Sequence, residues 1–170
     1  METIIIGGGC FWCTEAVFRR VKGIVKVTPG YAGGHTIDPT YQQVCTGATG
    51  HAEVVKIEFD PDLISLEEIL RLFFETHDPT TPNRQGYDVG TQYRSVILWK
   101  DQKQKETSEK VLQKMQAEFS EKIVTETKPL DHFYPAEEYH HNYFECHPEN
   151  SYCQVVIPPK LNKVKGLKEF

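Results

Sequence analysis

The sequence predicts an α/β (α+β) two-layer sandwich with a ferredoxin-like core, in which helices pack around a mixed β-sheet. Short β-branched runs alternate along the chain with stretches whose apolar residues recur at helical spacing. The chain has 170 residues, 39% of them hydrophobic and 25% charged, which is enough to bury a core without disulfides or metals. No linker, repeat or low-complexity block divides it, so residues 1–170 are expected to form a single domain.

The first third of the chain predicts three strands and one helix. The strands are expected at residues 3–6, 24–28 and 52–59. Three glycines break the first strand, and a helix then begins at Cys10 and closes near Gly23. Residues 29–50 are rich in Gly, Pro and Thr, which is typical of a long functional loop.

The clearest helix begins after Ser65. Ser65 and Glu68 match a capping box, and apolar residues recur from Leu66 at i, i+3, i+4, i+7 and i+8. A polar, glycine-bearing loop follows at residues 77–94. The remaining expected elements are strands at 95–99 and 123–127, a helix at 102–119, and a short helix at 135–144 with proline at its start. Residues 145–170 are expected to be a C-terminal tail.

Composition and charge exclude several classes of partner and location. The net charge of −5 argues against nucleic acid as a partner. The apolar run METIII is too short for a signal segment or a membrane span, and no later run is long enough, so a cytoplasmic location is expected. Thiols stay reduced there, so five cysteines, an odd number, indicate free, catalytic or metal-binding residues rather than disulfides.

Cys10 lies where a strand, a glycine turn and a helix N-terminus meet. Unpaired backbone N–H groups and the helix dipole would face its sulfur and lower the pKa of the thiol by one to several units from roughly 8.5. The triple glycine favours this reactive thiol over a buried, inert cysteine. Phe11 and Trp12 follow directly, and they could either fill the core or wall an apolar pocket suited to a methyl group or thioether.

Glu53 is the second candidate for catalysis. In the strand at 52–59, alternation places Glu53 on the same face as Val55 and Ile57, so its side chain is expected to point inward. A carboxyl held among apolar residues has a raised pKa and can serve as a general acid near neutral pH. The alternative is a carboxylate at a frayed strand end. His51 is a rival acid or base, but it lies one residue off that face and is expected to be a supporting loop residue.

Five segments, in order and over nearly the whole chain, resemble methionine sulfoxide reductases of type A. They are GCFW followed by a helix, GYAGG, YQQVCTGATGHAEVV, FFETHDPTTPNRQGYDVGTQYRS and AEEYHHNYF. The resemblance implies reduction of methionine S-sulfoxide, free and in proteins, to methionine: a peptide-methionine (S)-S-oxide reductase acting in repair of oxidative damage. It implies no cofactor and no metal, and we expect a monomer.

The resemblance also assigns roles to individual residues. Cys10 would be the nucleophile, with Phe11 and Trp12 as the wall that binds the methyl group. Glu53 would protonate the sulfoxide oxygen. Tyr41 and Tyr93 would donate hydrogen bonds to that oxygen, and Asp88 would support the site. These groups must converge, because protonation of the oxygen makes the poorly electrophilic sulfoxide susceptible to thiolate attack.

The chain departs from the family's usual motif at a residue that could regenerate the oxidised Cys10 thiol. Oxygen transfer would leave Cys10 as a sulfenic acid, which a second thiol resolves to a disulfide that thioredoxin reduces. Cys153, in an expected loop, is placed slightly ahead of Cys13, which stands where the family usually has glycine. Cys13 lies one turn from Cys10, and Cβ atoms so spaced are about 5–6 Å apart against roughly 3.5–4.5 Å in a disulfide, so the first turn would have to loosen. Cys146 is third, and Cys45 is expected to be a packed structural thiol.

Three alternatives remain open on residues alone. CFWC at a helix start could belong to a thioredoxin-like dithiol oxidoreductase, although that reading gives Glu53 no role. Cys10 and His51 could form a cysteine hydrolase, without a recognisable oxyanion pattern. A metal-binding protein could use His140, His141, Cys146, His147 and Cys153, although these residues lack paired ligand spacing.

Overall fold

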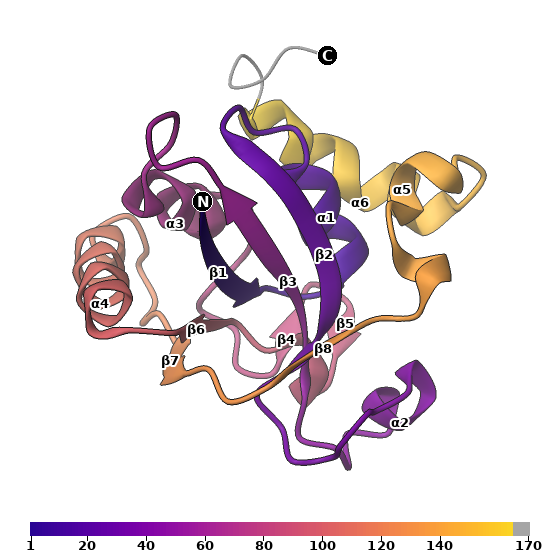
Figure 1. Ribbon diagram of the computed structural model, residues 1–170. Helices are drawn as coiled ribbons and strands as arrows, with labels where there is room; N and C mark the ends of the chain where they lie inside the picture. The colour runs from indigo at the N-terminus through magenta and orange to yellow at the C-terminus, as the bar shows by residue number, and fades with distance from the viewer. Residues whose placement is uncertain (165–170) are drawn as a thin grey trace.

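Six strands form one curled sheet in the computed structural model, which describes residues 1–164 (Figure 1). They are β1 (Glu2–Gly7), β2 (Ile24–Ala32), β3 (Ala52–Phe59), β6 (Val96–Trp99), β7 (Glu126–Pro129) and β8 (Phe133–Pro135), in the spatial order β7-β6-β1-β3-β2-β8. Neighbouring strands are antiparallel except β6 and β7, which run parallel. The sheet is therefore mixed, as predicted.

The central four strands, β6-β1-β3-β2, have the ferredoxin-like order. Helix α1 (Phe11–Phe18) lies between β1 and β2 in the chain, and α3 (Leu66–Glu75) lies between β3 and β6. A third long helix, α4 (Gln102–Gln116), follows β6 and precedes β7. The predicted fold class is confirmed.

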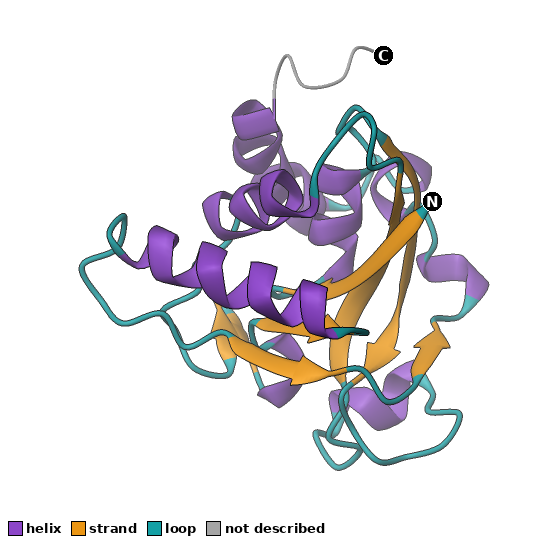
Figure 2. Cartoon of the chain, turned by 60° about the vertical axis from the view of Figure 1, so that its left-hand side comes forward, coloured by secondary structure: helices purple, strands orange, loops and turns teal. Residues whose placement is uncertain are grey.

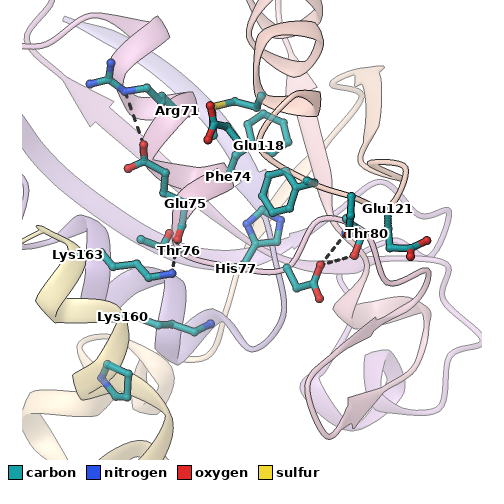
Figure 3. A pocket seen from close by; sticks show the side chains of 15 residues that line it. Arg71, Phe74, Glu75, Thr76, His77, Thr80, Glu118, Glu121, Lys160 and Lys163 are labelled. Atoms are coloured by element: carbon teal, nitrogen blue, oxygen red, sulfur yellow. Dashed lines mark hydrogen bonds and ion pairs between the residues drawn. The ribbon is translucent and has the colours of Figure 1, made fainter.

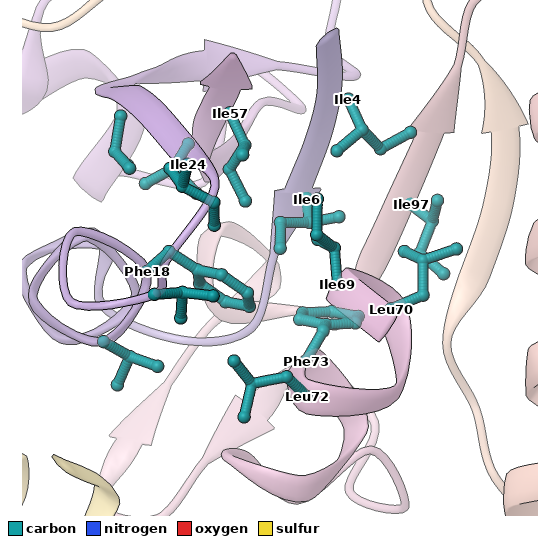
Figure 4. Packing of buried hydrophobic residues seen from close by; sticks show 14 of the residues in the cluster. Ile4, Ile6, Phe18, Ile24, Ile57, Ile69, Leu70, Leu72, Phe73 and Ile97 are labelled. Atoms are coloured by element: carbon teal, nitrogen blue, oxygen red, sulfur yellow. The ribbon is translucent and has the colours of Figure 1, made fainter. Parts of the chain in front are cut away.

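The main core lies between the sheet and helices α1, α3 and α4, which cover one face of it (Figure 2). Alternation along β1 turns Ile4 and Ile6 toward these helices, where they join Phe18 and Phe73 (Figure 4). Ile5 points to the opposite face and packs in a smaller cluster against the connection between β7 and β8. Both faces of the central strands are therefore buried. The packing of α1 on one face holds its start next to the end of β1 and the start of β3.

Local signals in the sequence locate several elements well. Strand β3 has the predicted bounds, and the capping box at α3 is present: Ser65 Oγ accepts from the Glu68 N–H at 3.1 Å, and the Glu68 carboxylate accepts from the Ser65 N–H at 2.9 Å. Helix α4 ends at Gln116 rather than 119, and the strand expected at 123–127 is β7, shifted to 126–129.

The two predicted loops contain regular structure. β2 continues to Ala32 because residues 30–32 pair with β3 on one side and β8 on the other. Helix α2 (Tyr41–Cys45) lies in the rest of the first loop, capped by Thr40. The second loop contains a two-stranded hairpin, β4 (Arg84–Gln85) and β5 (Asp88–Val89), followed by the 3-10 helix η1 (Thr91–Tyr93).

The helix predicted at 135–144 is wrong. Pro135 ends the edge strand β8, where its missing N–H costs no ladder hydrogen bond to an outer neighbour. The 3-10 helix η2 (Glu138–His140) and the short helix α5 (Tyr143–Cys146) follow. The chain thus changes direction several times over this segment instead of forming one helix.

The loop predicted around Cys153 is also wrong, because Cys153 lies in α6 (Ser151–Leu161). The Asn150 side chain caps this helix by accepting from the Cys153 N–H at 3.0 Å, and α6 packs against α1. The 3-10 helix η3 (Asn162–Val164) ends the described chain, so residues 165–170 of the predicted tail lie outside the described residues. Among residues 1–164, no helix combines the length and apolar composition that a membrane crossing requires.

Candidate active site

Cys10 is the N-cap of α1, directly after the turn that leaves β1. Gly9 in that turn has φ +99°, and a Cβ there would lie 2.7 Å from the Gln85 side chain, so only glycine fits. The Cys10 side chain is 9% exposed. The predicted junction of strand, glycine turn and helix start is therefore present, with the sulfur almost covered.

The predicted low pKa of the Cys10 thiol is wrong. Burial, a hydrogen bond with the Cys13 thiol and the charge of Glu53 together raise the pKa of Cys10, and the Trp12 backbone N–H opposes them only in part. The hydrogen bond from Cys10 instead lowers the pKa of Cys13, which Lys160 and Tyr152 lower further. The Cys10 thiol thus donates to the Cys13 sulfur at the start of α1.

Glu53 points inward from the start of β3, as predicted, and is 1% exposed. Its Oε1 accepts a hydrogen bond from the Phe11 N–H at 3.1 Å, which ties it to the first turn of α1. Its Oε2 is buried and has no hydrogen-bond partner within residues 1–164. Burial raises the pKa of Glu53 to about 8, although the Phe11 N–H lowers it, so this carboxyl keeps its proton at neutral pH.

Tyr41 and Tyr93 are brought to the same place by the two long loops. Tyr41 is the first residue of α2 and Tyr93 the last of η1, and both rings are half-buried. Burial and then the charge of Glu53 raise the pKa of each phenol above its ordinary value, and the charge of Cys10 adds to the effect at Tyr93. Both phenols therefore remain protonated donors beside the Glu53 carboxyl.

Asp88 borders this group from β5. Its carboxylate accepts a short hydrogen bond from the Tyr152 phenol of α6, and its charge contributes to the raised pKa of Glu53. Tyr152 also packs against the cluster that contains Cys13 and lowers the pKa of that thiol, so it links three parts of the site. Sequence reasoning missed Tyr152, and the only signal for it is its position directly before Cys153.

Phe11 and Trp12 differ in their surroundings. Phe11 is fully buried and its ring stacks on Tyr41, with centroids 6.4 Å apart, so it belongs to the core and supports the site from beneath. Trp12 is partly exposed and stacks flat on Tyr143 at 3.8 Å, while its indole N–H donates to His140 Nδ1 at 3.0 Å. Trp12 is thus held in one orientation, two residues after Cys10.

Two further carboxylates, both missed by sequence reasoning, hold segments of the site in position. Glu137 accepts from the Tyr31 phenol at 2.8 Å and from the Tyr41 backbone N–H at 2.9 Å, which fixes the start of α2. Glu15 accepts from the Asn142 N–H at 2.8 Å and places Tyr143 over α1. No local pattern reveals these contacts, because their partners lie about a hundred residues away.

Three of the five thiols gather in one cluster: Cys10 and Cys13 of α1 with Cys153 of α6. Cys153 is fully buried, and burial and the charge of Cys13 raise its pKa to about 11. Cys146 is exposed at the end of α5. The prediction that Cys45 is a packed structural thiol is wrong, since Cys45 is exposed at the end of α2.

The histidines proposed for a cysteine hydrolase or a metal site make other contacts. His51 Nδ1 accepts from the Gly34 N–H at 3.0 Å, and Nε2 donates to the Thr36 carbonyl at 2.7 Å, so His51 braces a loop rather than Cys10. His140 is buried, which lowers its pKa to about 4 and leaves it neutral. Over the described part of the chain, no three His, Cys, Asp or Glu side chains gather as metal ligands.

A cavity of about 1090 Å³ lies between the ends of α3, α4 and α6, and none of the predicted site residues lines it (Figure 3). His77, at the end of α3, and Lys160 of α6 are among its lining residues. The same two residues, with Cys13, line a small void of about 10 Å³ beside α1. Lys160 therefore lies between the open cavity and the Cys13 sulfur.

Comparison with known proteins agrees with this geometry. The family model described as peptide methionine sulfoxide reductase matches residues 2–169. Peptide methionine sulfoxide reductase MsrA of a Nitratiruptor species is 58% identical over 166 residues, covering 98% of this chain and 95% of its own.

Two solved structures of a yeast protein are also similar. Reduced Mxr1 from Saccharomyces cerevisiae superposes with a TM-score of 0.86 at 36% identity, covering 91% of this chain and 90% of its own. Mxr1 in complex with Trx2 gives a TM-score of 0.61 at 28% identity, covering 84% of each chain. The chain therefore belongs to the peptide methionine sulfoxide reductase family of oxidoreductases.

Proposed function

We propose that this enzyme reduces the S epimer of methionine sulfoxide, free and in proteins, through a sulfenic acid at Cys10. The observation that carries the proposal is the buried, protonated Glu53 carboxyl, whose Oε2 has no partner within residues 1–164 and whose charge reaches Cys10 and two phenols. A sulfoxide oxygen is the acceptor that such a set of donors lacks. The partly exposed Trp12 ring offers an apolar surface to the methyl group.

The residues account for each proton in the reduction. Cys13 gives its own proton to solvent and takes the Cys10 proton along their hydrogen bond, and the resulting Cys10 thiolate attacks the sulfoxide sulfur. Glu53 gives its proton to the sulfoxide oxygen while Tyr41 and Tyr93 donate hydrogen bonds to it. The sulfur–oxygen bond of the substrate breaks, and the oxygen ends as the hydroxyl of a Cys10 sulfenic acid. Methionine leaves, and Glu53 remains ionised until it takes a proton from solvent.

A second thiol then condenses with the sulfenic acid, and water and a disulfide form. Cys13 and Cys153 share the cluster with Cys10 and are the two candidates. Thioredoxin is the proposed reductant, because the yeast relative forms a complex with Trx2. We further propose a monomeric, cytoplasmic enzyme with one catalytic domain over residues 1–170, in which segment 145–170 carries the resolving candidate Cys153.

The test measures methionine formed from free and peptide-bound methionine sulfoxide with dithiothreitol as reductant, with each epimer supplied separately. We expect turnover of the S epimer, its loss in Cys10→Ser, and its retention in Cys146→Ser, because Cys146 is exposed and outside the thiol cluster. Turnover that survives Cys10→Ser would refute the mechanism. Insulin reduction without sulfoxide turnover would favour the thioredoxin-like alternative.

A further inference from the structure

We propose that His140 is a positioning residue that fixes the Trp12 ring, and that through this ring it sets how large an alkyl group on the sulfoxide sulfur the enzyme accepts. The inference rests on the proposed function above, in which the Trp12 ring offers its apolar surface to the methyl group. It concerns the orientation of that ring and leaves the bond-making steps unchanged.

The imidazole of His140 is fixed by its surroundings. The side chain is fully buried, and its ring centroid lies 5.0 Å from that of Phe11, 4.5 Å from that of Tyr41 and 4.0 Å from that of Tyr139. The backbone N–H of His140 donates to the Glu137 carbonyl at 3.0 Å and closes the turn of η2. Rings from α1, α2 and η2 therefore hold this imidazole, and a side chain packed in this way has little freedom to turn.

The hydrogen bond from Trp12 determines the tautomer of His140. The indole Nε1–H donates to His140 Nδ1 at 3.0 Å, and since an indole can only donate, Nδ1 carries no proton and Nε2 carries one. Burial lowers the pKa of His140 to about 4; the charge of Glu137 opposes this effect and that of His141 adds to it. The imidazole is thus neutral near pH 7 and keeps its Nδ1 lone pair for the indole.

The other nitrogen of His140 shows that stability alone does not account for a histidine here. Nε2 is buried and has no hydrogen-bond partner within residues 1–164. A buried N–H without a partner destabilises a fold, and an apolar side chain at this position would avoid that cost. The Trp12 side chain is partly exposed, so water can satisfy its N–H without His140. What only the imidazole supplies is an acceptor in a fixed place.

Tyr143 provides the second contact that holds Trp12. Its ring stacks on the indole at a centroid distance of 3.8 Å and an interplanar angle of 7°, and the Asn142 N–H before it donates to Glu15 of α1 at 2.8 Å. Stacking fixes the plane of the indole but lets it slide or turn within that plane. The hydrogen bond to His140, at the edge of the ring, removes this freedom. A fixed apolar wall discriminates against one extra methylene more strongly than a wall that can shift.

His140→Asn and His140→Leu form a matched pair of variants. Both remove the ring and have nearly the same shape, but only the asparagine side-chain oxygen can accept a hydrogen bond near the place of Nδ1. The test compares KM and kcat for the S epimers of methionine sulfoxide and ethionine sulfoxide, with dithiothreitol as reductant. Where wild type reduces no ethionine sulfoxide, the appearance of that activity replaces the ratio of the two substrates.

His140→Leu should raise KM for methionine sulfoxide with little change in kcat, because an apolar wall binds substrate and transition state alike. The preference in kcat/KM for methionine over ethionine sulfoxide should fall about two- to tenfold, the effect of one neutral hydrogen bond. His140→Asn should recover at least half of this loss on a logarithmic scale. Equal losses in both variants, or a wild-type preference in His140→Leu, would overturn the proposal.

Trp12→Phe shows whether the effect passes through the indole. A phenyl ring has no N–H to donate, so adding His140→Leu to Trp12→Phe should change KM and the substrate preference little further. Additive effects of the two substitutions would contradict the proposal, because His140 would then act through another residue.

Nuclear magnetic resonance of the wild-type protein decides the question where a variant does not fold. With 15N labelling, we expect a scalar coupling across the hydrogen bond between Trp12 Nε1 and His140 Nδ1, and none at Trp99 Nε1, which has no partner within residues 1–164. Absence of the coupling at Trp12 would overturn the proposal. If wild type forms no methionine, the proposed function fails. If it forms methionine but His140→Leu keeps its preference, only the positioning role fails.

Discussion

At the scale of single residues, the proposed acid Glu53 is a buried carboxyl, and its Oε2 has no hydrogen-bond partner within residues 1–164. Glu53→Gln keeps the shape and the contact with the Phe11 N–H but carries no acidic proton. We expect kcat for sulfoxide reduction to fall by about 10²–10⁴-fold, with no comparable loss of stability. Steady-state kinetics and a thermal unfolding curve check this. A parallel loss of both would reassign Glu53 to a structural role.

A second prediction for a single residue concerns Glu137, whose carboxylate accepts a hydrogen bond from the Tyr41 backbone N–H. Glu137→Ala should release the start of α2 and lower kcat roughly tenfold by misplacing the phenol, while Glu137→Gln should recover part of the loss. Tyr41→Phe supplies the decisive comparison. If Glu137 works through the Tyr41 hydroxyl, adding Glu137→Ala to Tyr41→Phe should lower kcat little further, whereas additive effects would contradict it.

The residues that sequence patterns located are those whose setting is local. Cys10 at a helix start and Glu53 on an inward strand face follow from spacing alone, and the structure places both as expected. The pKa of Cys10 did not follow, because it depends on burial and on a thiol partner rather than on the helix terminus. Tyr152 reaches the site only because α6 folds onto α1.

At the scale of helices and strands, the elements defined by local patterns were predicted well, and those that depend on distant contacts were not. The capping box of α3 and the alternation of β3 are complete within one segment, and both elements were located closely. The segment 135–144 was predicted as a helix from its leading proline, yet Pro135 is held opposite Gly30 in a strand pair. The segment around Cys153 was predicted as a loop, yet it forms helix α6, which contains Pro158 and Pro159 and packs against α1.

Gly34 allows a test at this scale, because it lets the loop before α2 lie against the start of β3. A Cβ at Gly34 would lie 2.3 Å from the His51 backbone N and 2.4 Å from the Thr49 carbonyl O, and neither atom can move alone. Gly34→Ala should therefore lower the free energy of unfolding by about 1–3 kcal/mol in urea denaturation. Ile37→Ala, an exposed change in the same loop, should alter it by less than about 0.5 kcal/mol. Equal effects would contradict the close approach.

At the scale of the whole molecule, the fold class was predictable but the strand order was not. Alternating strand and helix signals indicate the class, whereas the order β7-β6-β1-β3-β2-β8 depends on pairings between distant segments, such as residues 30–32 with 133–135. No local pattern encodes such a pairing. The same long-range contacts bring the two phenols, Asp88 and α6 to Cys10.

The free energy of unfolding should depend on pH because of Glu53. Its pKa is about 8 in the folded protein against an ordinary 4.5, so the folded state retains a proton that the unfolded chain loses between these values. This contribution is fully present below pH 4.5 and is lost as pH rises to about 8. The unfolding free energy of Glu53→Gln relative to wild type should therefore rise by roughly 3–5 kcal/mol from pH 4.5 to pH 8. Urea titrations at both ends check this, and a constant difference would contradict it.

The stacking of Trp12 on Tyr143 gives the protein an internal optical probe. The sequence contains two tryptophans, and the other, Trp99, lies at the end of β6 with the Lys105 ammonium over its ring. Trp12, by contrast, lies two residues from Cys10, the proposed nucleophile, and is hydrogen-bonded to His140. In a Trp99→Phe background, with excitation at wavelengths that tyrosine does not absorb, emission would therefore come from Trp12 alone, and its wavelength and intensity would report changes around the start of α1 without any added label.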